Sequence, residues 1–206
     1  MKILRAVWHV MALVGVATVA GGAWFASQGL SARPTPGPVE TRLARAACHW
    51  LVPADARARV NPEAATPDTL KAGMAHWADH CATCHANDGL GQTAIGQGLY
   101  PKPPDMRLAD TQDLSDGELF YIIEHGVKIT GMPAWGSGTP EGDQLTWHLV
   151  QFIRRLPTLT ADEITEMEEL NPRSRAEWPA LEEERRFLSG TLEVPEPAPP
   201  GHVHRP

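Results

Sequence analysis

The pentapeptide Cys81-Ala82-Thr83-Cys84-His85 dominates the interpretation of this sequence. It has the form C-x-x-C-H, which is the attachment signal for a c-type haem. Each thiol can bond to one vinyl group of the same haem, and the histidine then lies beneath the iron as an axial ligand. The sequence therefore predicts one covalently bound haem c, held by Cys81, Cys84 and His85. The 206 residues contain no second motif of this form.

A C-x-x-C redox pair of the thioredoxin type is the alternative interpretation of the same residues. Such a pair would follow a strand and open a helix. In this chain the motif closes a helical stretch, and a histidine follows it at once. These two features favour haem attachment.

The iron of such a haem takes a sixth ligand or keeps an open position. Met132, in Gly131-Met132-Pro133-Ala134-Trp135, is the best candidate for that ligand, because a thioether is a soft axial ligand. A second histidine would instead give a bis-histidine site with a lower reduction potential. The other candidates in the same segment are Met74, Met106, His80, His125 and His148.

The first 26 residues predict a membrane-spanning helix. After Lys2 and Arg5, residues 6–26 contain no Asp, Glu, Lys or Arg. These 21 residues would span about 31 Å as a helix, which is about the thickness of a bilayer core. We expect an uncleaved anchor whose positive N-terminal flank stays in the cytoplasm.

A cleaved signal peptide is the competing interpretation, with cleavage after the small residues Ala20-Gly21-Gly22. The apolar run continues through Trp24 and Phe25, which suit the far membrane interface and favour the anchor. Either interpretation places the rest of the chain on the periplasmic or extracytoplasmic side of the cytoplasmic membrane.

Residues 27–65 are expected to form a Pro-rich spacer with one short helix. Alternating prolines in residues 33–38 predict a stiff, extended segment, and a helix over residues 41–52 follows. The third cysteine, Cys48, stands next to His49. This pair could bind a metal ion, but a free thiol on a short amphipathic helix is the favoured interpretation.

Residues 66–157 have the pattern of a compact helical domain. Thr66 and a following proline mark the start of a helix that reaches residue 80. Gly73 and Trp77 lie four residues apart on one face of this helix. A glycine inside a helix costs about 1 kcal/mol relative to alanine, so Gly73 indicates a close approach by another helix.

Residues 86–114 show no periodicity and are rich in glycine and proline, which predicts a long loop wrapped around the haem. A ligating histidine normally donates its second ring N–H to an acceptor. For His85 a backbone carbonyl near Pro103-Pro104 could take this role.

Two more helices complete the predicted domain. A capping box at residues 115–118 opens the first of them, and Gly126 ends it. The second begins at Thr139 and ends at Pro157. Its apolar stripe consists of Leu145, Leu149, Phe152, Ile153 and Leu156, flanked by Trp147 and Val150.

The tail, residues 158–206, is predicted to be acidic and partly helical. A second capping box at residues 160–163 opens a short acidic helix, and residues 179–188 predict another. The Pro-rich end is predicted to be disordered. Its His202 and His204 could bind a metal ion loosely, although two solvent-exposed histidines are the favoured interpretation.

The charge distribution restricts the partners of the protein. Residues 66–157 contain six Lys/Arg and eleven Asp/Glu, and the tail contains five and eleven. Phosphate contacts require Lys and Arg, so nucleic acid is disfavoured as a partner. An acidic surface instead predicts docking to a redox partner protein that carries a basic patch.

With these features together, residues 66–157 resemble the small mono-haem c-type cytochromes of the class-one fold. The resemblance is closest to bacterial membrane-anchored forms and to haem-c subunits of respiratory complexes. It rests on Gly73-x-x-x-Trp77, the C-x-x-C-H motif, the Pro-rich loop, the capped middle helix, the Met132 pentapeptide and the amphipathic last helix, in that order. Residues 27–65 and the tail lie outside it.

The resemblance implies an all-α, cytochrome c-like fold with an N-terminal transmembrane helix. The first and last helices of the domain would cross at Gly73 and Trp77, near Trp147 and Val150, with the haem between the His85 and Met132 sides. A haem with both axial positions filled has no vacant site for a substrate, so we expect an electron carrier and not an enzyme. The alternatives are a haem-c subunit of a larger oxidoreductase, and a ligand sensor or peroxidase whose iron Met132 does not bind.

Overall fold

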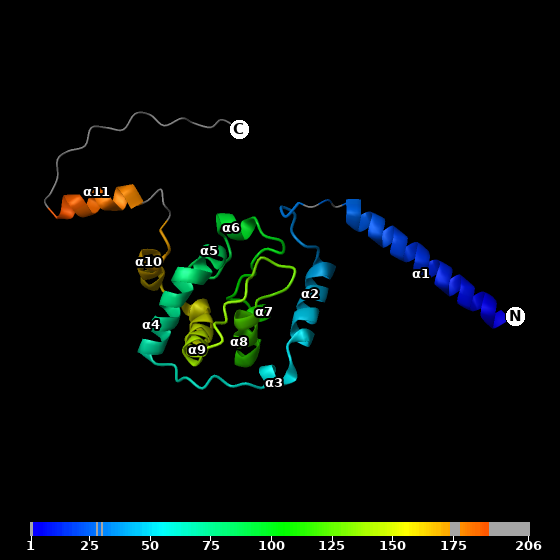
Figure 1. Cartoon of the computed structure of the whole chain (residues 1–206), viewed down its shortest axis with the longest axis horizontal. Coiled ribbons are helices and arrows are strands. Elements are labelled where there is room, and N and C mark those ends of the chain that lie inside the picture. The colour runs from blue at the N-terminus through cyan, green and yellow to red at the C-terminus, as the bar shows by residue number, and fades with distance from the viewer. Residues whose placement is uncertain (1, 28, 30, 174–177, 190–206) are drawn as a thin grey trace, which may run out of the picture.

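The computed structural model describes residues 2–27, 29, 31–173 and 178–189, and this part of the chain is helical with no strand (Figure 1). The all-α prediction is therefore confirmed. His202 and His204, and the Pro-rich end that contains them, lie outside the described residues. The elements are α1 (Lys2–Ser27), α2 (Pro38–Leu51), α3 (Ala54–Arg57), α4 (Pro67–His76), the π turn η1 (Trp77–Cys81), α5 (Ala82–His85), α6 (Ala94–Gln97), α7 (Ala109–Gln112), α8 (Asp116–His125), α9 (Pro140–Arg155), the 3-10 turn η2 (Leu156–Thr158), α10 (Ala161–Leu170) and α11 (Trp178–Leu188).

The helix that carries the motif is longer than the sequence predicts. Thr66 caps α4 as expected, because its side chain accepts a hydrogen bond from the first turn. Beyond α4 the helix continues through η1, where the N–H of Ala82 bonds to the carbonyl oxygen of Trp77, five residues earlier. The predicted end at residue 80 is wrong, since one continuous helix runs over residues 67–85.

The first and last helices of the domain cross at Gly73, as predicted. A Cβ atom at this position would clash with the carbonyl oxygen of His148 and lie 2.9 Å from Cβ of Phe152. One turn later, the ring of Trp77 packs on Phe152 with their centroids 5.9 Å apart. The missing side chain of Gly73 thus lets α4 and α9 approach closely.

The position of Trp147 at this crossing differs in detail from the expectation. The nearest atoms to Gly73 belong to His148 and Phe152. Trp147 lies on another face of α9 and stacks on Phe120 of α8, with the ring centroids 4.2 Å apart. Trp147 therefore joins α9 to α8, and residues 148 and 152 join α9 to α4.

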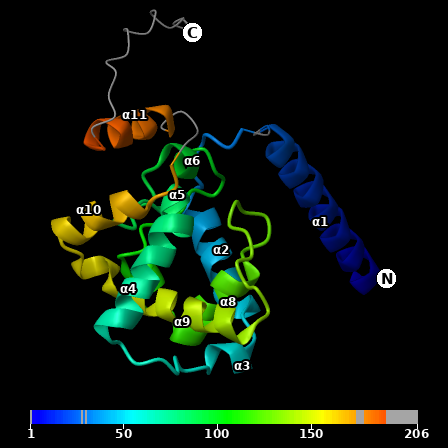
Figure 2. The same ribbon diagram turned by 60° about the vertical axis from the view of Figure 1, so that its left-hand side comes forward.

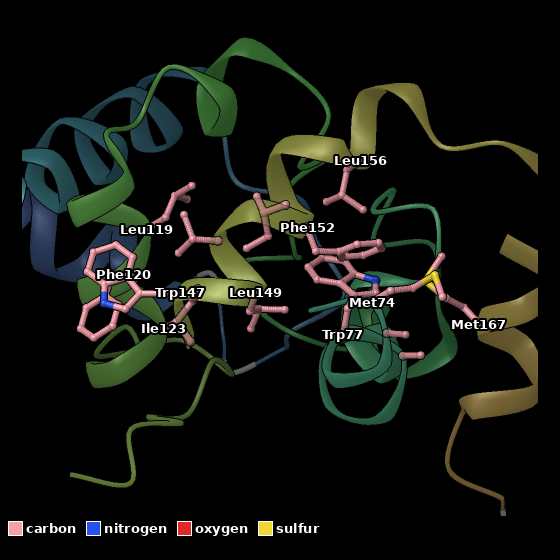
Figure 3. Close-up of a cluster of buried hydrophobic side chains, with 14 residues drawn as sticks. Met74, Trp77, Leu119, Phe120, Ile123, Trp147, Leu149, Phe152, Leu156 and Met167 are labelled. Atoms are coloured by element: carbon pink, nitrogen blue, oxygen red, sulfur yellow. The ribbon is translucent and has the colours of Figure 1, made fainter. Parts of the chain in front are cut away.

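A single cluster of buried side chains connects α4, η1, α8, α9 and α10 (Figure 3). The large side chains Trp77, Leu149, Phe152 and Leu156 are each at most 2 % exposed. The cluster contains Met74, Trp77, Ala78, Ala82, Leu119, Phe120, Ile123, Trp147, Leu149, Val150, Phe152, Ile153, Leu156 and Met167.

Residues 52–63, which the sequence analysis assigned to the spacer, pack against α8 and α9 of the domain. Val52 is buried, and Gly117 of α8 lies so close to the backbone of α3 that a Cβ there would clash with the carbonyl oxygen of Ala56. Ser115 Oγ donates a hydrogen bond of 2.9 Å to the carbonyl oxygen of Arg57. The folded region thus includes chain that lies before the predicted domain start at residue 66.

The same segment also covers the ring pair on α8 and α9. The guanidinium carbon of Arg59 lies 4.1 Å from the ring centroid of Phe120 and 5.0 Å from that of Trp147. Asn61 Nδ2 donates a hydrogen bond of 3.0 Å to the carbonyl oxygen of Trp147. Long-range contacts of this kind leave no periodic signal in a sequence.

Helix α10 packs on the opposite side, beside α4 (Figure 2). Met167 is fully buried in the core cluster, and Figure 3 shows it reaching toward Met74. With its amide oriented to match its neighbours, Asn171 donates to Asn87 Oδ1 at 2.9 Å and to the carbonyl oxygen of Ala78 at 3.0 Å. The predicted capping box of this helix is present, and the helix is part of the folded core.

The predicted loop over residues 86–114 contains two short helices, α6 and α7, which the sequence analysis missed. Each has four residues, too few for a hydrophobic period to be visible. Thr93 caps α6 by accepting a hydrogen bond from Gly96 N at 2.9 Å. Similarly, α2 begins at Pro38 rather than Thr41, because a proline suits the first helical turn.

Candidate haem site

The C-x-x-C-H motif closes the long helix, as the sequence analysis predicted. Cys81 is the last residue of η1, and the next four residues form α5. Ala86 has a left-handed φ of 61° and ends the helix. Cys81 and Cys84 are partly exposed, and within the described part of the chain neither is in a disulfide. Two free thiols three residues apart on one helix end match the spacing that haem attachment requires.

The segment after the motif holds the motif's backbone in place. Thr93 Oγ1 donates to the carbonyl oxygens of Thr83 and Cys84, at 2.8 Å and 3.3 Å. Gly91 N donates to the carbonyl oxygen of His85 at 2.8 Å. Gly96 lies so close to Cys84 that a Cβ atom on residue 96 would clash with the carbonyl oxygen of Cys84. These contacts show that residues 91–96 pack against the backbone of the motif.

His85 is a partly buried residue whose imidazole has one buried nitrogen. Among the described residues, its Nδ1 is buried without a hydrogen-bond partner, and burial lowers the pKa of the ring to about 4. The predicted hydrogen bond from His85 to a carbonyl near Pro103-Pro104 is absent from this described region. Instead, the carbonyl oxygen of Pro103 faces Gly91. A neutral, buried imidazole is the form that binds a metal ion, so the site fits a haem iron.

Trp77 positions His85 directly. Its indole Nε1 donates a hydrogen bond of 3.1 Å to the carbonyl oxygen of Ala86, and its ring lies 5.7 Å from the imidazole, tilted by 47°. Sequence reasoning placed Trp77 at the helix crossing and missed this second role. The sequence signal for this role is the nine-residue separation between Trp77 and Ala86, because it places an indole donor near the end of the motif helix.

Cys81 differs from Cys84 in its environment. Burial, and secondarily the neighbouring Cys84, raise the pKa of the Cys81 thiol to about 12. The group is therefore a neutral thiol at physiological pH. Cys81 also packs, partly buried, against the core cluster.

The loop that carries Met132 is held by several backbone hydrogen bonds. The carbonyl oxygen of Met132 accepts from Val127 N at 3.2 Å, and its N–H donates to Thr130 Oγ1 at 3.1 Å. Trp135 N donates to the carbonyl oxygen of Ile123 at 3.0 Å, which ties the loop to α8. The loop therefore presents Met132 from a defined backbone, and its side chain packs partly buried against the core cluster.

The other candidate ligands lie in different surroundings. Met74 is buried in the core. His80 and His125 are exposed, and each contacts a neighbouring aromatic ring, Trp135 and Tyr121 respectively. His148 lies against α4, with Nε2 3.6 Å from a carboxylate oxygen of Glu63. Met106 resembles Met132, since it also packs partly buried against the core cluster.

A motif-bearing helix end, a buried histidine and a crossed-helix core define a c-type cytochrome domain. In agreement, residues 68–153 match the family model described as "Cytochrome C oxidase, cbb3-type, subunit III". A search of curated proteins found no match for the chain. The domain carries covalently bound haem c and serves electron transfer. Helix α1 is long and apolar enough over Arg5–Ser27 to cross a membrane, which is consistent with a membrane anchor.

Proposed function

We propose that the protein is an electron carrier with one haem c, bonded to Cys81 and Cys84 and ligated axially by His85 and Met132. Helix α1 anchors it in the cytoplasmic membrane, and the haem domain lies on the periplasmic or extracytoplasmic side. The observation that carries this proposal is the partly buried imidazole of His85 with its buried Nδ1. Its unpartnered nitrogen directly follows two free thiols at a helix end.

The residues of the chain have separate tasks in this function. The thiols of Cys81 and Cys84 would hold the haem through two thioether bonds, each formed by addition of one S–H across one vinyl group. His85 stays neutral because burial lowers its pKa, and its lone pair is free for the iron. The bound haem supplies a centre that gains and loses one electron. With Met132 as sixth ligand, no position is open for a substrate.

Haem attachment is tested by the double variant Cys81→Ala/Cys84→Ala. We expect no covalent haem, which a denaturing gel stained for haem peroxidase activity will measure. The matched control is Cys48→Ala, whose thiol is exposed on α2, and which should stain as strongly as the parent. Haem staining of the double variant would contradict the proposal.

The sixth ligand is tested by Met132→Ala, with Met106→Ala as the matched control. Met106 packs against the same core cluster and is the competing methionine. Oxidised protein should show the weak long-wavelength band of a methionine–iron bond. Only Met132→Ala should lose this band and bind carbon monoxide when reduced. Loss of the band in Met106→Ala alone would assign the ligand to Met106, and a parent that binds carbon monoxide readily would favour a sensor or peroxidase.

A second candidate function is a haem-c subunit of a larger oxidase complex. The family description in the match to residues 68–153 favours it, and the acidic tail is a candidate docking element. Purification from native membranes, with residues 174–206 present or deleted, separates the two functions. Oxidase subunits that co-purify only with the intact chain would support the complex. A protein that elutes alone in both cases would support the independent carrier.

A further inference from the structure

Helix α2 exposes its apolar side chains rather than burying them. Val39, Leu43 and Trp50 are 68 %, 67 % and 82 % exposed, and Leu51 is similarly open. The spacing of residues 39, 43, 46 and 50 places them along one face of the helix, with Ala46 in the intervening step. An apolar stripe of this kind usually faces a core, so its exposure requires a physical explanation.

The contacts that tie α2 to the domain are polar and come from residues outside this stripe. Arg45 pairs with Asp110 at the start of α7, and His49 Nδ1 lies 2.6 Å from Glu118 Oε1 in α8. These ties come from residues outside the stripe, and α2 buries none of its own residues. The exposed stripe therefore takes no part in attaching the helix to the domain.

The position of α2 in the chain indicates what covers the stripe. Helix α1 ends at Ser27 and α2 begins at Pro38. The ten residues between them reach at most about 36 Å when fully extended, so α2 stays near any membrane that α1 spans. In Figure 1, α2 lies on the side of the domain nearest α1. The stripe ends in Trp50, a residue type that favours the membrane interface, and Arg42 is exposed beside it.

We propose that α2 lies in the membrane–water interface on the extracytoplasmic side, with Val39, Leu43 and Trp50 inserted among the lipids. The occupant of the stripe is thus the lipid surface. The polar ties through Arg45 and His49 then fix one face of the cytochrome domain toward the bilayer. This inference rests on the proposed function, because it requires α1 to span the membrane.

The test uses nitroxide spin labels on the full haem-loaded chain in liposomes of neutral and anionic phospholipids. One label sits at residue 43 in Leu43→Cys/Cys48→Ser. The matched control is a label on the native Cys48, which is exposed on another side of α2. We expect the ratio of collisions with dissolved oxygen to collisions with a water-soluble nickel chelate to be severalfold higher at residue 43. A ratio at residue 43 equal to that at Cys48 would overturn the inference.

A third label separates failure of this inference from failure of the proposed function. It sits within α1, in Val14→Cys/Cys48→Ser. A lipid-like ratio at residue 14 with a water-like ratio at residue 43 overturns the interfacial helix and leaves the anchor intact. Water-like ratios at both positions overturn the anchor as well. If the label at residue 43 is shielded in native membranes but accessible to water in liposomes, the inference is overturned and a protein partner covers the stripe instead of lipid. The absorbance of the bound haem verifies that every variant is folded.

Discussion

The indole N–H of Trp77 donates a hydrogen bond of 3.1 Å to the carbonyl oxygen of Ala86. The Trp77 ring is buried, and this bond ties it to the residue that follows the motif helix. Ala86 combines a positive φ of 61° with an extended ψ of 161°, and its carbonyl oxygen accepts its hydrogen bond from the Trp77 side chain. Trp77 therefore connects the helix crossing to the residue that follows His85.

Replacing Trp77 with phenylalanine should destabilise the domain and loosen His85. An aromatic ring is retained, but the partly buried carbonyl oxygen of Ala86 loses its partner, and an unsatisfied buried group costs about 1–3 kcal/mol. Denaturant unfolding followed by haem absorbance measures this loss, and the reduction potential reports the change at His85. Trp147→Phe is the control, because the stacking of residue 147 on Phe120 does not involve Trp77. An unchanged reduction potential in Trp77→Phe would show that the Trp77–Ala86 hydrogen bond stabilises the fold without influencing His85.

Introducing a side chain at Gly73 should force α4 and α9 apart. A Cβ there meets the backbone of His148, which cannot rotate away as a side chain can. We expect Gly73→Val to lower the free energy of unfolding by a few kcal/mol, since overpacking costs about 1–3 kcal/mol and valine adds β-branched crowding. Gly73→Ala should cost less, because alanine gains helix propensity.

The control for this pair is Lys71→Val, which places the same β-branched residue on the exposed side of α4. Denaturant unfolding followed by haem absorbance compares the three variants. Equal stability of Gly73→Val and Lys71→Val would show that the close approach at Gly73 does not limit the packing of the two helices.

A haem-domain fragment should need more chain than residues 66–157. Val52 and Met167 are buried, and full burial of an apolar side chain contributes about 1.5–3 kcal/mol. A fragment of residues 52–171 should therefore unfold at a clearly higher denaturant concentration than one of residues 66–157. The single substitutions Val52→Ala and Met167→Ala in the longer fragment assign the difference to each end. Coincident unfolding curves would show that neither flanking segment stabilises the domain.

The stability of α10 should depend on pH through Glu163. The backbone N–H of Thr160, and after it the Thr160 hydroxyl and Arg155, hold the pKa of this carboxyl below its usual value. The stabilisation is therefore complete above the unfolded pKa, about 4.3 for glutamate, and is lost as the pH falls through the lower folded value. Thermal unfolding at neutral and acidic pH should show that Glu163→Gln flattens this dependence. Glu169→Gln, on the same helix and exposed, should keep it.

Electron exchange with a basic partner should slow as salt is added. The domain carries eleven acidic and six basic residues between positions 66 and 157. The Debye length falls from about 10 Å at 0.1 M to about 3 Å at 1 M, so attraction between docking surfaces is screened. Stopped-flow mixing measures the rate, and a small uncharged electron donor serves as the salt-independent control. If the rate of electron exchange with the basic partner does not change with salt concentration, the interface is apolar or the complex is permanent.

Short-range signals in the sequence predicted their structures well. The capping boxes at residues 115–118 and 160–163 both form, because a cap depends on residues three apart. The glycine at position 73 predicted the helix crossing, since only a close neighbour explains a glycine inside a helix. The C-x-x-C-H motif likewise predicted a c-type haem from five consecutive residues, in agreement with the family match to residues 68–153.

Long-range packing could not be predicted in the same way. Arg59 contacts rings on α8 and α9 that lie far away in sequence, and nothing near residue 59 indicates them. Met167 follows an acidic stretch that looks solvated, yet it is buried in the core. The surroundings of His85 were also missed, because the backbone path of residues 101–104 depends on the whole loop.

The π turn at Trp77–Cys81 sets the length of the chain between the core and the haem, not only its shape. Through the five-residue bond, Trp77 shares its inward face with Ala82, which is 6 % exposed, while Cys81 is partly buried. The turn thus holds one residue more than an ordinary α-helix would place between these two inward positions. Deleting one residue at position 79 or 80 would leave Ala82 four residues after Trp77 in an ordinary helix, with the motif in its present orientation. The shortened chain should therefore still take up haem. A full-length chain forced into an ordinary helix would instead turn the motif by about 100° and bring Cys81 into the place of Ala82.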